Sequence, residues 1–248
     1  ALMAKERCRL AVLDCDIYKN FPPGSTDGDA QYYGEILAHY LAGGFGVEDP
    51  DFEVEQFHVN SETPEFPKVS DFDAFAIPGS KSDVGDGDAW IEPLAELVRE
   101  IVRQKKKLLG VCYGHQLICH ALGGSQGPQP PFIFGVERLV MTSPSERWFG
   151  SGTSNLVMFK SHGCQVISPP PGAVILASTP RTPVEMFAIG DDVLSMQGHP
   201  EFTLPLMEVL MPRIPGNKVT TDLKLDEKTD SERLRLALRC FLLNQPPP

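Results

Sequence analysis

Short apolar runs alternate with amphipathic segments over the first half of the chain. The runs at 9–14 and 107–111 are mainly apolar and only a few residues long, as strands are when both faces are buried. Residues 90–104 instead carry apolar side chains at helical spacing. Such alternation is typical of a parallel sheet covered by helices on both faces. Strands are expected at 9–14, 52–59, 73–77 and 107–111, and helices at 30–41, 90–104 and 115–122.

The pattern changes after Gly123. Residues 132–197 hold short strand-like pieces separated by Pro, Gly and Ser, which predict hairpins added to the same sheet rather than a second domain. These strands are expected at 133–141, 156–160, 174–178, 184–189 and 193–197, and closing helices at 203–211 and 231–243. Residues 1–248 are therefore predicted to form one α/β domain, with a mobile polar loop at about 212–230.

Charge and composition then limit the partners. The 248 residues include 22 Lys+Arg against 33 Asp+Glu, which gives a net charge of −11. Nucleic-acid binding needs a concentrated basic face, so no nucleic-acid partner is expected. No apolar run approaches the roughly 18 residues of a membrane-spanning helix, so no membrane partner is expected. The six cysteines are scattered and no secretory segment is recognisable, which predicts free thiols and a cytoplasmic location.

The strongest chemical signal is Gly110-Val111-Cys112-Tyr113-Gly114, which has the form G-x-C-x-G between an expected strand and an expected helix. A cysteine on such a turn is lifted above the sheet, and the flanking glycines remove side chains that would clash. The N-terminus of the next helix places partial positive charge at the sulfur, which favours the thiolate. The alternative is a small buried hydrophobe in a glycine-rich turn, but the strand–turn–helix context favours a nucleophile.

A thiolate nucleophile needs a base, and the base needs a group that orients it. His199-Pro200-Glu201 offers both, because Pro200 favours an extended backbone and residues two apart in an extended chain point the same way. The Glu201 carboxylate can then accept a hydrogen bond from one imidazole nitrogen of His199 while the other nitrogen faces the sulfur. A histidine taken alone is more often structural, and it is the combination with Cys112 that indicates catalysis.

Backbone N–H groups could supply the oxyanion hole of such a site. The N–H of Tyr113, directly after the nucleophile, is one candidate donor. Gly79, at the end of the expected strand 73–77, is a second, because glycine lets the backbone approach a ligand closely. The alternative for Gly79 is an ordinary Pro-Gly turn.

Other patterns indicate no cofactor and no metal. His115 and Cys119 share a helix face, but no second ligand cluster with recognised spacing accompanies them. Neither of the glycine-rich phosphate-binding motifs is present. The acidic run 83–88 lacks the twelfth-position ligand and the flanking helices of a calcium loop, and it predicts a solvated turn.

Together, residues 110–116 and 198–201 resemble the paired motifs of the class I (triad) glutamine amidotransferase family, and the resemblance extends over most of the chain. It implies a flavodoxin-like α/β fold with a mostly parallel central sheet. The residues that it implies are Cys112, His199 and Glu201 for a catalytic triad, and the N–H groups of Gly79 and Tyr113 for the oxyanion hole.

The same resemblance implies a site for the glutamyl group of the substrate. Gln116 would help to hold this group, and residues 161–164 are similar to the family's S-H-x-D segment, whose backbone contacts the α-amino and α-carboxylate end. Cys164 departs from that pattern, because it occupies the usual acidic position. The residues implied in this segment are Ser161, His162, Gly163 and Cys164.

The chain is most similar to stand-alone members of the family such as the plant γ-glutamyl peptidases, on residues 88–91, 105–110 and 196–201. The resemblance implies a cysteine-dependent amidohydrolase that cleaves a γ-glutamyl amide of a small molecule, either glutamine or a γ-glutamyl peptide, through a thioester. Two alternatives stay open: a glutaminase that delivers ammonia to a separate synthetase, and a catalytically silent binding module of the same fold.

Overall fold

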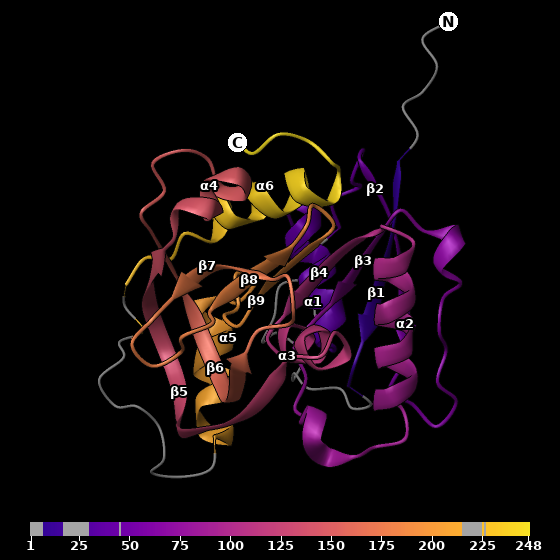
Figure 1. Ribbon diagram of the computed structural model, residues 1–248, viewed down its shortest axis with the longest axis horizontal. Coiled ribbons are helices and arrows are strands. Elements are labelled where there is room, and N and C mark those ends of the chain that lie inside the picture. Colours follow the sequence, from indigo (N-terminus) through magenta and orange to yellow (C-terminus); the bar gives the residue numbers. More distant parts are fainter. Residues whose placement is uncertain (1–6, 17–29, 45, 215–224, 226) are drawn as a thin grey trace, which may run out of the picture.

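A computed structural model describes residues 7–16, 30–44, 46–214, 225 and 227–248. A nine-stranded sheet runs through these residues in the order β2-β1-β3-β4-β9-β8-β7-β5-β6 (Figure 1). The first five strands in this order are parallel to one another. They are β2 (Phe52–His58), β1 (Cys8–Asp14), β3 (Ala74–Ile77), β4 (Lys107–Val111) and β9 (Val193–Met196).

The other four strands extend the sheet in antiparallel fashion. They are β8 (Met186–Ile189), β7 (Val174–Ser178), β5 (Ser125–Met141) and β6 (Asn155–Ser168). The predicted α/β architecture with added hairpins is therefore confirmed. β8 and β9 form one of these hairpins, and β9 also pairs with β4 in parallel, so the two parts of the sheet join at β9.

Two strands are longer than the sequence predicts. β5 begins at Ser125 and β6 ends at Ser168, whereas strands were expected only at 133–141 and 156–160. The additional part of β5 contains three prolines, and its pairing with β6 shifts register between Pro128 and Ile133. Proline has no N–H group to donate a hydrogen bond to the neighbouring strand. A segment rich in proline therefore lacks the residue pattern from which strands are predicted.

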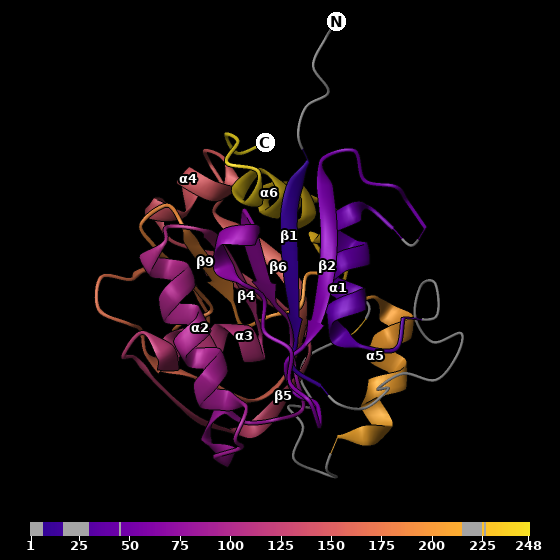
Figure 2. The same cartoon turned by 90° about the vertical axis from the view of Figure 1, so that its right-hand side faces the viewer.

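Helices cover both faces of the sheet (Figure 2). In β1, Leu10 and Val12 pack in the apolar layer of α1 and α6, while Ala11 and Leu13 pack in the layer of α2 and α3. This two-sided burial explains why β1 is apolar at consecutive positions. The helices are α1 (Tyr33–Ala42), α2 (Ile91–Arg103), α3 (Tyr113–Ala121), α4 (Glu146–Phe149), α5 (Leu204–Leu210) and α6 (Ser231–Leu242).

A third apolar cluster joins α5 to the antiparallel strands. Leu206, Met207 and Leu210 of α5 pack with Phe134 of β5 and Phe159 of β6. The loop predicted at about 212–230 lies largely outside the described residues. None of the helices in the described ranges is long and apolar enough to cross a membrane.

The start of α3 lies directly against the end of β3. A Cβ atom on Gly114 would stand 2.2 Å from the carbonyl oxygen of Ile77, and one on Gly110 would stand 2.8 Å from the backbone of Gly114. Real Cβ contacts are never this short, so both flanking glycines of the G-x-C-x-G motif are required by backbone packing. This approach brings β3, β4 and α3 together around Cys112.

We expect Gly114→Ala to destabilise the protein by about 2–3 kcal/mol, as overpacking typically does. Alanine favours a helix over glycine by about 1 kcal/mol, but the clash is with a backbone carbonyl that no side-chain rotation can relieve. Urea unfolding followed by circular dichroism measures the change. Gly85→Ala is the control, since its Cβ would meet the nearest atom, Asp83 Oδ1, at an ordinary 3.6 Å; equal stability of the two variants would contradict this account.

Candidate active site

Cys112 occupies the turn between β4 and α3 in a strained conformation. Its φ of 51° and ψ of −100° are rare for a residue with a side chain and cost of order 1–3 kcal/mol. The turn is tied on both sides, because Cys112 N–H donates to the Met196 carbonyl at 2.9 Å and Gly114 N–H donates to the Pro78 carbonyl at 3.1 Å. The sulfur therefore lies at the N-terminus of α3, where the helix dipole favours negative charge.

His199 comes to Cys112 from the segment that follows β9. Its N–H donates to the Phe159 carbonyl at 2.8 Å, and its ring stacks on Phe202 with the ring centroids 3.8 Å apart. The ring nitrogen Nδ1 lies 2.7 Å from Oε1 of Glu201, and the ring also hydrogen-bonds the side chain of Cys112. The imidazole is thus held between a sulfur and a carboxylate, an arrangement suited to a nucleophile with its base and an orienting group.

The electrostatics of this buried group set the charge of His199. Burial alone lowers the pKa of the imidazole, because it disfavours the charged form. The Glu201 carboxylate and the Cys112 sulfur act in the opposite direction, and together they raise the pKa of His199 to about 10. At neutral pH the ring is therefore an imidazolium that can give up a proton.

Gly79 and Tyr113 both lie next to Cys112. A Cβ atom on Gly79 would stand 3.7 Å from Cys112 Cβ and only 2.9 Å from Cε1 of His199, so the absence of a side chain here leaves room for the imidazole. Tyr113 is the first residue of α3, and its ring packs on Trp90 with centroids 5.6 Å apart. The backbone of both residues thus adjoins Cys112.

Cys112 opens into a cavity of about 470 Å³. All of the residues expected to bind the glutamyl group line it: Gln116, Ser161, His162, Gly163 and Cys164. The side-chain amide of Gln116 donates to the Cys164 carbonyl at 3.0 Å, which connects α3 to β6. This hydrogen bond fixes the Gln116 side chain against residue 164 in the cavity wall.

His162 is buried in the cavity wall as a neutral ring. Its Nδ1 lies 2.9 Å from the Cys164 carbonyl, which can only accept, so this nitrogen carries the hydrogen. Burial, followed by the positive charge of Lys160, holds the pKa of His162 well below its usual range. Nε2 is consequently an acceptor, and among the described residues it has no hydrogen-bond partner.

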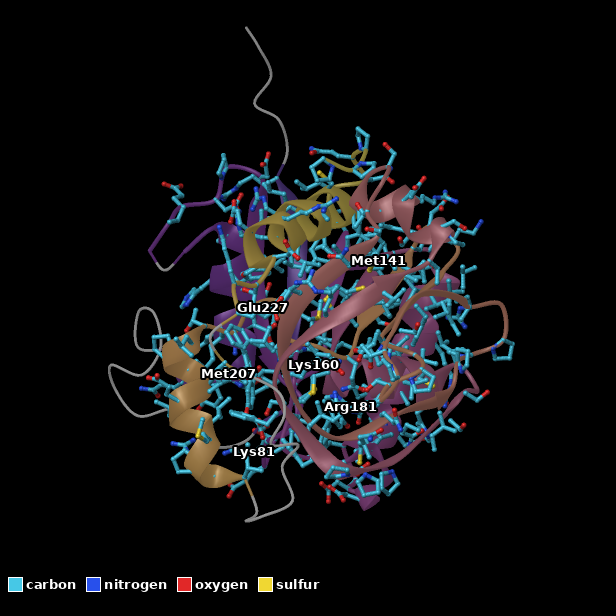
Figure 3. All side chains as sticks on the ribbon, turned by 90° about the vertical axis from the view of Figure 1, so that its left-hand side faces the viewer. Lys81, Met141, Lys160, Arg181, Met207 and Glu227 are labelled. Atoms are coloured by element: carbon cyan, nitrogen blue, oxygen red, sulfur yellow. The ribbon has the colours of Figure 1, made fainter. Side chains whose placement is uncertain are left out.

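The structure adds residues that the sequence patterns did not single out. The side-chain amide of Gln197 donates to the Cys112 sulfur at 3.7 Å. In the sequence, its position directly before Gly198-His199 is the feature that could have pointed to it. Lys160 and Glu185 form a fully buried ion pair, and the backbone carbonyl of Glu185 accepts from Gln197 N–H at 2.8 Å. The pair links β6, on which Figure 3 labels Lys160, to the residue directly before β8.

Asp83 is a second addition. The sequence predicted a solvated turn for residues 83–88, but Asp83 lines the cavity and accepts the S–H of Cys164. The contact pairs residues 81 positions apart, and no local pattern reveals such a pairing.

The described residues contain no group of three or more His, Cys, Asp or Glu side chains placed to hold a metal ion. His115 is fully buried, and its ring nitrogens meet Ser195 Oγ at 2.9 Å and the Val184 carbonyl at 3.2 Å. Burial lowers the pKa of His115 to about 3, so it is a neutral part of the core. All six cysteines are free thiols.

Comparison with known proteins identifies relatives of this chain. Residues 38–213 match the sequence profile of the family described as glutamine amidotransferase class-I. Gamma-glutamyl peptidase 4 of Arabidopsis thaliana is 32% identical over 222 residues, which cover 83% of this chain and 86% of that protein. Gamma-glutamyl peptidase 3 of the same plant is 31% identical over 182 residues, 71% of this chain and 72% of that protein.

A solved glutamine amidotransferase from Thermotoga maritima has the same fold, with a TM-score of 0.72 at 15% identity over 97% of this chain and 98% of that one. The profile match covers well over half of the 248 residues, and the two relatives from Arabidopsis thaliana align over most of their own length. The chain therefore belongs to the class-I glutamine amidotransferase family.

Proposed function

We propose that this protein hydrolyses the γ-glutamyl amide bond of a small molecule, with Cys112 as nucleophile, His199 as acid and base, and Glu201 as the group that orients His199. The observation that carries the proposal is the position of the buried imidazole, which contacts both the sulfur and the carboxylate. Family membership and the names of the two plant relatives support a γ-glutamyl substrate.

The first half of the reaction transfers the glutamyl group to the enzyme. The Cys112 sulfur attacks the carbonyl carbon of the substrate's γ-glutamyl amide, and the N–H groups of Gly79 and Tyr113 stabilise the negative oxygen that develops. His199, an imidazolium at neutral pH, gives its proton to the amine as the C–N bond breaks. The amine leaves, and the glutamyl group remains on the sulfur as a thioester.

The second half regenerates the enzyme. The neutral His199 takes a proton from water as the water oxygen attacks the thioester carbonyl. The same backbone N–H groups stabilise the second oxyanion, the C–S bond breaks, and glutamate leaves. Each step uses side chains, backbone and water, and the proton that His199 gives up in the first half is recovered in the second.

Cys112→Ala should lower kcat for hydrolysis of a γ-glutamyl dipeptide by more than about 10³-fold, because loss of a nucleophile removes the covalent route. The fold should be retained, which circular dichroism verifies. Cys240→Ala, on α6 and outside the cavity, is the matched control and should keep full activity.

Two outcomes of this assay would contradict the proposal. Undiminished hydrolysis by Cys112→Ala would exclude the thioester route. Absence of hydrolysis by the wild type, on both the dipeptide and glutamine, would favour the silent binding module. Glutamine turnover that appears only when a synthetase is added would instead favour an ammonia-delivering subunit.

Glu201→Gln should lower the pKa of His199, because it removes the charge that opposes the effect of burial. In the wild type the pKa of His199 is raised from 6.5 to about 10. The stabilisation that the Glu201 charge gives to the protonated ring is therefore fully present below about pH 6.5 and is lost as the pH rises through 10. The stability advantage of the wild type over Glu201→Gln should therefore shrink over this interval.

NMR titration of histidine ring signals measures the pKa directly, and urea unfolding at several pH values measures the stability difference. Glu208→Gln, on α5, is a control with the same change of charge. The account is wrong if His199 titrates at the same pH in the wild type and in Glu201→Gln.

A further inference from the structure

In the described part of the chain, few charged side chains line the cavity beside Cys112. Among the described residues that line it, Asp83 has the one carboxylate, and Lys81 and Arg213 have the two cationic groups. His162 is neutral, since burial keeps its pKa well below the usual range. Lys81 lies near the end of α5 in Figure 3, in agreement with the shared cavity lining of Lys81 and Leu210.

The Asp83 carboxylate is held in place from two directions. Oδ1 accepts the N–H of Gly85 at 3.0 Å, and Oδ2 accepts the S–H of Cys164. Burial and the nearby Asp83 carboxylate raise the pKa of Cys164 to about 12, so this thiol keeps its proton and acts as a donor at neutral pH. Both donors, the N–H of Gly85 and the S–H of Cys164, are neutral, so neither of them neutralises the negative charge of Asp83.

Residue 164 also connects Asp83 to the nucleophile. The Cys164 carbonyl accepts the amide of Gln116 from the helix that Cys112 begins. The neighbouring carbonyl of Ser161 lies 3.9 Å from the Cys112 sulfur. The Asp83 carboxylate is therefore bonded, through Cys164, to the same segment 161–164 that contacts the reacting sulfur through Ser161.

We infer that Asp83 binds the α-ammonium group of the substrate, an assignment that rests on the proposed function. An ammonium group that leaves water for a partly buried site requires a charged acceptor, and charge-assisted hydrogen bonds are the strong ones. Among the described residues that line the cavity, Asp83 is the one with a charged acceptor.

The test compares two substrates that differ only in the ammonium group: a γ-glutamyl dipeptide and the corresponding glutaryl amino acid. The wild type should prefer the γ-glutamyl compound in kcat/KM. In Asp83→Asn the preference should fall by about 10- to 100-fold, the range expected for loss of a hydrogen bond to a charged group. The change should appear mainly in KM, because Asp83 binds the substrate away from the reacting carbonyl.

Asp88→Asn is the matched control, since it removes the same charge from the same loop at a residue outside the cavity lining, and it should keep the wild-type preference. An unchanged preference in Asp83→Asn would overturn the assignment while γ-glutamyl hydrolysis by the wild type still supports the proposed function. Hydrolysis of neither compound by the wild type would contradict the proposed function itself. Equal cleavage of both compounds by the wild type would overturn only the assignment.

Cys164 offers a second measurement. Cys164→Ser keeps a donor for Asp83 Oδ2, whereas Cys164→Ala removes it. We expect Cys164→Ala to raise KM for the γ-glutamyl dipeptide by about 3- to 10-fold, as loss of one positioning hydrogen bond would. Cys164→Ser should restore most of the affinity. Equal KM values for the two variants would show that the thiol does not position Asp83.

Discussion

The close approach of β3 to the start of α3 is the constraint on which the rest of the site depends. Gly114 packs against the Ile77 carbonyl at a distance that excludes any side chain, and the backbone between β4 and α3 must therefore turn sharply. Cys112 takes up this turn at a φ of 51°. The strain is maintained because hydrogen bonds from Cys112 and Gly114 to neighbouring segments fix the backbone on both sides.

Much of the parallel half of the fold could be predicted from sequence. Its strands are buried on both faces, so they are short and apolar, and amphipathic helices follow them. Both features can be recognised from residues that are close together in the sequence. The predicted site residues Cys112, His199 and Glu201 were also recognisable, because a glycine-flanked cysteine and a His-Pro-Glu segment are local patterns. The structure brings the three side chains together, and their catalytic roles stay a prediction.

The parts that could not be predicted depend on contacts between distant segments. Asp83 lies in an acidic run that would suit any solvated turn, and only its contact with Cys164 distinguishes it. Lys160 and Glu185 look like surface charges in the sequence, but the structure buries them as a pair. Such a pair has to be satisfied internally, because removing one member leaves an isolated charge in the core.

The bridge between Phe159 and His199 has a consequence for how the antiparallel strands behave as a unit. β9, β8, β7, β5 and β6 pair one with the next in this order, and the bridge returns from β6 to the third residue after β9. The pairing therefore closes into a ring, with the imidazole at the closure. One strand of such a ring cannot shift without disturbing its neighbours, so the closed pairing fixes the backbone of His199 relative to the rest of the antiparallel strands.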